Sequence, residues 1–94
     1  MVTSSKTAGR KTADALIGTG IGLISGILIE TDKTNDVTVI LYDNTAASGT
    51  IVFKALCPGT QDTRLFSFNF PIRTTTGIYA DVTGTGAAYT VYTV

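Results

Sequence analysis

Histidine and tryptophan are absent from this 94-residue chain, and charged residues make up only 15% of it. Histidine is the commonest general base and metal ligand, so its absence removes the simplest routes to catalysis and metal binding. The single cysteine, Cys57, cannot form an internal disulfide and has no histidine to activate it as a nucleophile. We therefore interpret Cys57 as a small buried hydrophobic residue and expect no enzyme activity, cofactor or metal site.

The charges also balance, with seven basic and seven acidic residues. A nucleic-acid-binding domain carries a basic excess, so we expect no nucleic acid as a partner. Hydrophobic residues reach 44% of the chain. Low charge at this hydrophobicity indicates that a partner covers part of the surface, although the many threonine hydroxyls are an alternative source of solvation.

Apolar residues that alternate with polar ones, between polar or glycine-rich turns, predict about six β-strands and no helix. A chain of this length forms one domain. The strand spacing is typical of a single small antiparallel β-sandwich with a jelly-roll-like order. The expected strands are the second half of 15–30, then 37–43, 50–56, 65–72, 77–82 and 88–94.

Two of these segments, 65–72 and 15–30, carry apolar side chains that predict buried faces. The sequence LFSFNFPI (65–72) has the clearest alternation and places Phe66, Phe68 and Phe70 on one face, as the expected centre of the core. Pro71 indicates an edge strand or the end of a strand. In the earlier segment, the same period places Ile21, Leu23, Ile27 and Ile29 on one face, with Ile24 and Leu28 on the other.

Residues 1–14 are polar and carry three of the positive charges, without any periodic pattern. We interpret them as an extended N-terminal arm ahead of a β-sandwich domain at 15–94. The preferred interpretation is an arm that reaches a neighbouring subunit, and the alternative is pairing with its own sheet. The candidate partner-binding residues are Lys6, Arg10 and Lys11, which would contact an acidic protein surface, and Tyr92. The alternative for the three cations is a solvated tail without a partner. Tyr89 and Tyr92 differ in parity, so one is expected in the core and the other at the surface or an interface.

Three other patterns have simpler interpretations. The apolar segment 15–29 follows positive charges as in a signal peptide, but four glycines interrupt it and it is short for a membrane span, so no membrane is expected. The glycines of 18–22 suggest a phosphate loop, which would need a helix after them. Glu30, Asp32 and Asp36 cluster around one turn, and we favour solvation of that turn over calcium binding.

Two segments carry a resemblance to a known group of proteins. LYDNTAASGTIVF (41–53) and GIYADVTGTGAAYTVY (77–92) resemble small virion proteins of tailed bacteriophages. In that group, a strand ending in Leu-Tyr-Asp-Asn leads through a short turn into an apolar strand, and a Gly-Ile-Tyr strand precedes a glycine turn and a closing strand. The similarity covers about residues 20–94 and leaves out the N-terminal arm and Cys57.

The resemblance implies a β-sandwich that decorates or cements the outer surface of a capsid. Such a protein would bind the major capsid protein, often as a homotrimer, and would stabilise the head. Within a virion, the alternatives are a head-fibre, tail or adaptor component. A host-surface glycan-binding module is an alternative from another functional class.

Overall fold

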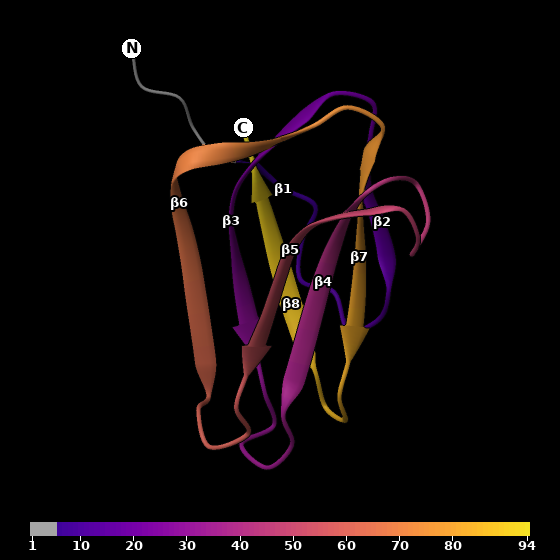
Figure 1. Cartoon of the computed structure of the whole chain (residues 1–94). Helices are drawn as coiled ribbons and strands as arrows, with labels where there is room; N and C mark the ends of the chain where they lie inside the picture. Colours follow the sequence, from indigo (N-terminus) through magenta and orange to yellow (C-terminus); the bar gives the residue numbers. More distant parts are fainter. Residues whose placement is uncertain (1–5) are drawn as a thin grey trace.

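Two antiparallel sheets pack face to face in the computed structural model, which describes residues 6–94 (Figure 1). Sheet A has the strand order β1-β8-β3-β6, and sheet B has the order β2-β7-β4-β5. This arrangement confirms the predicted all-β sandwich. The strands are β1 (Lys6–Thr7), β2 (Ala15–Thr19), β3 (Gly22–Glu30), β4 (Val37–Asp43), β5 (Thr50–Cys57), β6 (Thr63–Thr74), β7 (Gly77–Thr83) and β8 (Ala88–Thr93).

The strand pairing has the form of one long hairpin folded over on itself. β1 pairs with β8, β2 with β7, β3 with β6 and β4 with β5, and these pairs alternate between sheet A and sheet B. Two further ladders, β3 with β8 and β4 with β7, join the pairs into four-stranded sheets. This is the eight-stranded jelly-roll order, which the sequence predicted.

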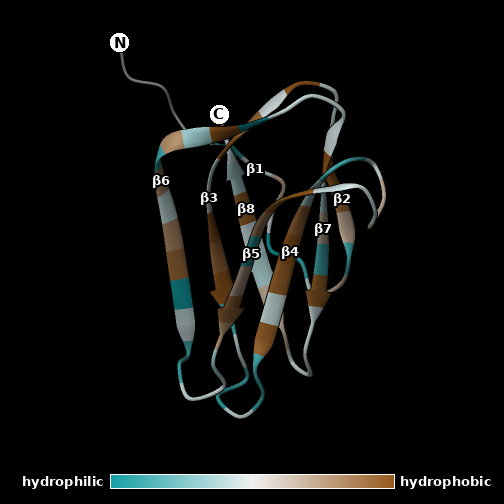
Figure 2. Ribbon diagram, viewed as in Figure 1, coloured by the Kyte–Doolittle hydropathy of each residue, from teal (hydrophilic) through white to brown (hydrophobic). Residues whose placement is uncertain are grey.

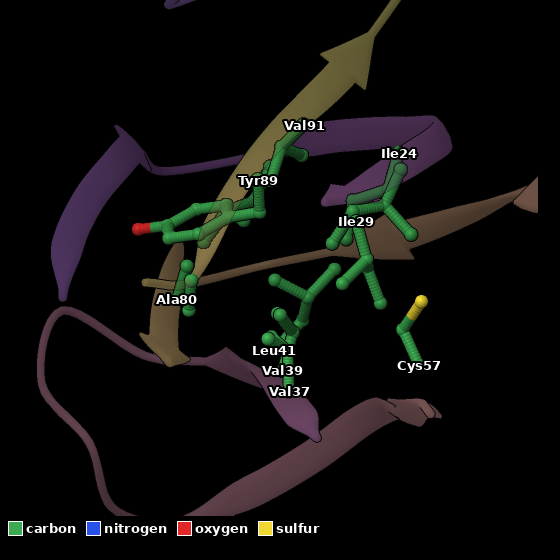
Figure 3. Packing of buried hydrophobic residues seen from close by; sticks show 12 residues of the cluster. Ile24, Ile29, Val37, Val39, Leu41, Cys57, Ala80, Tyr89 and Val91 are labelled. Carbon is green, nitrogen blue, oxygen red and sulfur yellow. The ribbon is translucent and has the colours of Figure 1, made fainter. Parts of the chain in front are cut away.

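The centre of the core lies between the central strands of the two sheets, where β3 and β4 are hydrophobic along most of their length (Figure 2). Side chains from β4 in sheet B face those from β3 and β8 in sheet A (Figure 3). Branched aliphatic residues dominate, as expected for β-strands. The fully buried set includes Ile24, Ile27, Ile29, Val37, Val39, Leu41, Ala80 and Tyr89.

A bulge in β3 changes which of its residues face the core. The register of its ladders shifts just after Ile24, so the alternation of side chains changes phase there. Ile24 consequently lies inside with Ile27 and Ile29, whereas Leu23 faces outward and Ile21 is 71% exposed. The prediction that Ile21 and Leu23 share one face with Ile27 and Ile29 was therefore wrong.

The predicted phenylalanine stripe does not form the centre of the core. In the β3–β6 ladder, Ser67 pairs opposite Gly26 and Ile72 opposite Ile24, so residues 68–71 bulge out across from one residue of β3. Pro71 has no amide proton to donate to a ladder, and β6 bends sharply in this region (Figure 1). Phe70 is 89% exposed as a result.

Phe66 and Phe68 instead close one side of the sandwich. Both are half-buried, and both rings pack edge-on against Phe53 of β5, with centroids 5.2 and 5.1 Å away respectively. β5 and β6 are edge strands of different sheets. These three rings form the aromatic seam, which fills the gap between the two edges.

Candidate protein-binding surfaces

The described part of the predicted arm, residues 6–14, lies against its own sandwich. Lys6 and Thr7 pair with β8 as strand β1, and the backbone of Lys11 exchanges hydrogen bonds of 2.8 and 2.9 Å with Tyr89. Oδ1 of Asp14 then accepts a 2.8 Å hydrogen bond from the amide of Val82 in the other sheet. The segment thus joins the two sheets, and residues 1–5 of the predicted arm lie outside the described residues.

The three predicted cationic residues are spread along β8 rather than gathered in one patch. Lys6 lies opposite Thr93 at one end of that strand, and Lys11 lies opposite Tyr89 near the other end. Arg10 forms an exposed ion pair with Glu30, with 3.0 Å between Nε and Oε1. An exposed pair of this kind contributes at most about 1 kcal/mol. Binding of an acidic surface by these residues stays a prediction.

Tyr89 and Tyr92 lie on opposite faces of β8, as their parity predicts. Tyr89 is buried, and its hydroxyl donates a 2.8 Å hydrogen bond to the carbonyl of Ala13. Tyr92 is half-buried on the outer face of sheet A, between Thr7 of β1 and Gly26 of β3. Its predicted role in partner binding stays a prediction.

The carboxylates around the β3–β4 turn are held by the protein itself. Asp32 accepts hydrogen bonds from the amides of Thr34 and Asn35, and the Asn35 amide is the main cause that holds the pKa of Asp32 below its ordinary value. Asp36 accepts a 2.7 Å hydrogen bond from the amide of Gly59. These contacts agree with the interpretation as turn acids. Among residues 6–94, no group of three or more acidic, cysteine or histidine side chains is gathered for a metal ion.

The Leu-Tyr-Asp-Asn motif holds two turns. Asp43 accepts hydrogen bonds from the amides of Thr75, Thr76 and Gly77, so it fixes the turn between β6 and β7. Asn44 donates from its side chain to the carbonyl of Ser48 and fixes the turn between β4 and β5. The residues that carry the resemblance therefore have a structural role in this chain.

The glycine-rich segment 18–22 forms the turn between β2 and β3. A strand, not a helix, follows it, so the helix N-terminus that a dinucleotide-binding loop requires does not occur at this position. Gly20 adopts a φ of 74°, and its amide donates to the carbonyl of Thr76. A pocket of about 160 Å³ beside the turn is lined by glycine and aliphatic residues, which include Ile17, Ile21 and Val94, and by Lys6, Thr19 and Thr93.

Cys57 is fully buried at the end of β5, within the hydrophobic core. Burial is the main cause that raises the pKa of its thiol. A buried thiol with a raised pKa is a poor nucleophile. The structural interpretation of Cys57 is thus confirmed.

The outer face of sheet B carries apolar side chains on all four strands. We call this surface the sheet B face; it comprises the outward side chains Leu16, Thr38, Ile40, Tyr42, Ile51, Lys54, Leu56, Tyr79, Asp81 and Thr83. Alternation along single segments does not identify this surface. The sequence pattern that indicates part of it lies in β4. Ile40 and Tyr42 are apolar there, although they alternate with the core residues and so face away from the core.

The second apolar surface is the corner of β6. Phe70 projects from the bulge, and Leu65, earlier on the same strand, is 63% exposed. We call this pair of residues the β6 corner. The strict alternation of residues 65–72 predicts Phe70 in the core, so the sequence pattern does not predict the β6 corner as an exposed surface.

Comparison with protein-family models, with curated proteins and with solved structures gives no match for this chain. Within residues 6–94, no helix has the length and apolar character needed to cross a membrane. The jelly-roll topology, the sheet B face, the β6 corner and the resemblance to virion proteins are therefore the features that bear on function.

Proposed function

We propose that this chain is a structural protein that decorates the outer surface of a tailed-bacteriophage capsid and stabilises the head by binding the major capsid protein. The jelly-roll topology is compatible with this role, because viral capsid and lectin domains both use it. A shared fold does not define function, so the surface must decide between these classes.

The observation that carries the proposal is the exposed side chain of Phe70. An 89% exposed phenylalanine on a bulge beside a proline is an apolar projection that a partner's pocket can accept. Complete burial of such a side chain contributes about 1.5–3 kcal/mol. Contacts of this modest size add up when many copies bind one repetitive lattice. Each copy would then hold neighbouring capsid subunits together against the outward pressure of packaged DNA.

The described pocket favours a protein partner over a glycan. A glycan-binding site needs an aromatic platform with polar groups around it. Within residues 6–94, the lining of the pocket beside the β2–β3 turn contains no aromatic residue and combines glycine and aliphatic residues with Lys6, Thr19 and Thr93. The apolar projection of Phe70 fits contact with a protein surface better than contact with sugars.

The test is to follow the full-length chain through purification of particles from the host or virus that encodes it. We expect it to migrate with intact heads on a density gradient, at a fixed ratio to the major capsid protein. Attachment of the F70S variant should fall by roughly tenfold or more, because 1.4 kcal/mol already corresponds to tenfold. The matched control is I21S, which also replaces an exposed apolar residue and should attach normally.

Two results would overturn the proposal. If the wild-type chain stays with the soluble proteins while heads are intact, the capsid is not its partner. If F70S and I21S attach as well as the wild type does, the β6 corner is not the attachment site.

A further inference from the structure

A row of apolar side chains crosses all four strands of the sheet B face. The ladders place Ile51 opposite Tyr42, Tyr42 opposite Tyr79, and Tyr79 opposite Leu16. Ile51 is 50% exposed and Leu16 is 46% exposed, and the two tyrosines between them are half-buried. The most exposed members thus lie at the two margins of the row.

The neighbouring row carries opposite charges at its two margins. Lys54 of β5 pairs opposite Ile40 of β4, and Ile40 pairs opposite Asp81 of β7. Asp14, one residue before β2, accepts a hydrogen bond from the amide of Val82. Burial raises the pKa of the Asp81 carboxyl, and the neighbouring Asp14 carboxyl raises it further. The β5 margin is therefore positive, and the β2–β7 margin is negative.

This pattern is complementary to itself. Two copies can place their sheet B faces against each other, related by a two-fold axis that lies between the two faces and runs parallel to the strands, midway between β4 and β7. This axis places β5 of one copy over β2 of the other, and β4 over β7. Lys54 of each copy then lies over the Asp14 position of the other, next to Asp81, which itself lies over Ile40. In the apolar row, Ile51 faces Leu16 and Tyr42 faces Tyr79. No like charges in these two rows oppose each other.

The margins of the sheet are less suited to self-association than its face. Both edge strands are irregular, because the register shifts in β2 between Leu16 and Gly18 and in β5 opposite Leu41 and Tyr42. Bulges of this kind disrupt edge-to-edge pairing of sheets. The self-complementary surface is accordingly the face.

We propose that two copies of this chain pair through their sheet B faces about a two-fold axis, with Lys54 of each copy against Asp81 and Asp14 of the other. An interface of this type uses the same patch on both subunits. It is independent of attachment through the β6 corner, which belongs to the other sheet. The resemblance predicts a homotrimer instead, and molar mass separates the two assemblies.

The test is sedimentation equilibrium of the full-length chain over a range of concentrations. The wild type should approach twice the 9.8 kDa mass of one chain. The single variants K54D and D81K should each weaken the pair by roughly tenfold or more. K54D places like charges in contact at both ends of the interface, and D81K leaves a lysine beside Asp14 opposite Lys54, which cancels the attraction there. The matched control K33D changes the same charge in the β3–β4 turn and should pair normally.

Mixing gives the decisive measurement. When K54D and D81K are combined, the mixed pair has native Lys54 against native Asp14 and Asp81 at one end of the interface. At the other end, the carboxylate introduced by K54D meets the ammonium group introduced by D81K and the native Asp14 beside it. One end is therefore native and the other has lost its net repulsion, so the mixed pair should be stronger than the pair formed by either variant alone. Recovery on mixing cannot come from a change in the folding of either variant alone.

Several results would overturn this proposal without affecting the proposed function. The proposal fails if the wild type stays monomeric. It also fails if the wild type has the mass of three chains and K54D does not change that mass, or if both single variants pair as strongly as the wild type does. If the wild type is monomeric but K54D no longer attaches to heads, the sheet B face binds the capsid and not a second copy. If pairing follows the charges while the chain never accompanies heads, the pair stands and the capsid role fails.

Discussion

The centre of the sandwich and its β5–β6 side are built from different residues and are sealed to different degrees. At the centre, β3 and β4 contribute branched aliphatic side chains such as Ile27, Val39 and Leu41, all fully buried. At the aromatic seam, Phe66 and Phe68 remain half-buried although they are larger. Burial in this fold therefore depends on the position of a strand within its sheet more than on the hydrophobicity of its residues.

The strand order explains this difference. β3 and β4 have a neighbouring strand on both sides, whereas β5 and β6 each have one neighbour and an open edge. The flat phenylalanine rings cover the gap between these two edges. Arg64 joins the edges as well, because its guanidinium lies 4.8 Å from the centre of the Phe66 ring and donates to the carbonyl of Leu56.

The largest effect on stability is expected at the centre. Leu41→Ala should lower the free energy of unfolding by about 2–5 kcal/mol, because the fully buried side chain leaves a cavity between the sheets. Urea denaturation followed by circular dichroism measures this change. Leu41→Met, which conserves most of the volume, is the control and should cost less than about 1.5 kcal/mol.

A smaller effect is expected at the aromatic seam. Phe68→Ala should lower the free energy of unfolding by about 1.5–2.5 kcal/mol. This is roughly half of the loss for a buried phenylalanine, because the Phe68 ring is only half-buried. The same denaturation experiment compares it directly with Leu41→Ala. A larger loss for Phe68→Ala than for Leu41→Ala would contradict the division between centre and seam.

Much of the fold could be predicted from the sequence, because alternation identifies strands well. The predicted strand 37–43 coincides with β4, and 77–82 falls within β7. The burial of individual residues could not be read in the same way. The bulges in β3 and β6 change the phase of alternation partway along a strand, and the pattern does not state which strands lie at an edge.

The candidate surfaces were harder to predict for a similar reason. Lys54 and Asp81 come from different parts of the chain and share a row only because β4 pairs with both β5 and β7. Phe70 belonged to the most regular alternation in the sequence, and one proline and a bulge removed it from the core. Such sites depend on register, which is a property of paired strands rather than of one segment.

The centre contains one buried phenol, and its pH dependence distinguishes it from the seam. Burial is the main cause that raises the pKa of Tyr89 from 10.0 to about 12. Between these values the unfolded chain has lost the phenolic proton and the folded chain has kept it, so stability is complete below pH 10 and falls as pH rises towards 12. Tyr89→Phe should remove this contribution and flatten the alkaline decline.

At neutral pH, Tyr89→Phe should cost about 1 kcal/mol, because the hydrogen bond to the carbonyl of Ala13 is lost. Thermal unfolding of both proteins at neutral pH and through the alkaline range measures the two effects. The Tyr92→Phe variant, altered on the outer face of sheet A, is the control. If Tyr89→Phe and the wild type decline in parallel above pH 10, the phenol of Tyr89 is not the source of the alkaline loss.

The smallest of these effects is expected at Asp43, which connects the two regions. It ends the central strand β4 and holds the turn that follows the seam strand β6. The hydrogen bond from the backbone amide of Thr76 is the main cause that lowers the pKa of Asp43, and the amides of Thr75 and Gly77 lower it further. The folded protein therefore favours the charged carboxylate. The resulting stability is present above the ordinary value of 3.8 and is lost as pH falls through the lowered pKa.

Asp43→Asn keeps an oxygen that accepts hydrogen bonds but removes the charge, so the variant should be less stable than the wild type at neutral pH. The difference should shrink in acid, because the wild type also becomes neutral there. Denaturant unfolding at neutral pH and below pH 3.8 measures both values. Asp62→Asn, in the exposed β5–β6 turn, is the matched control for the loss of one negative charge. A difference between Asp43→Asn and the wild type that does not change with pH would show that the carboxylate's charge does not hold the turn.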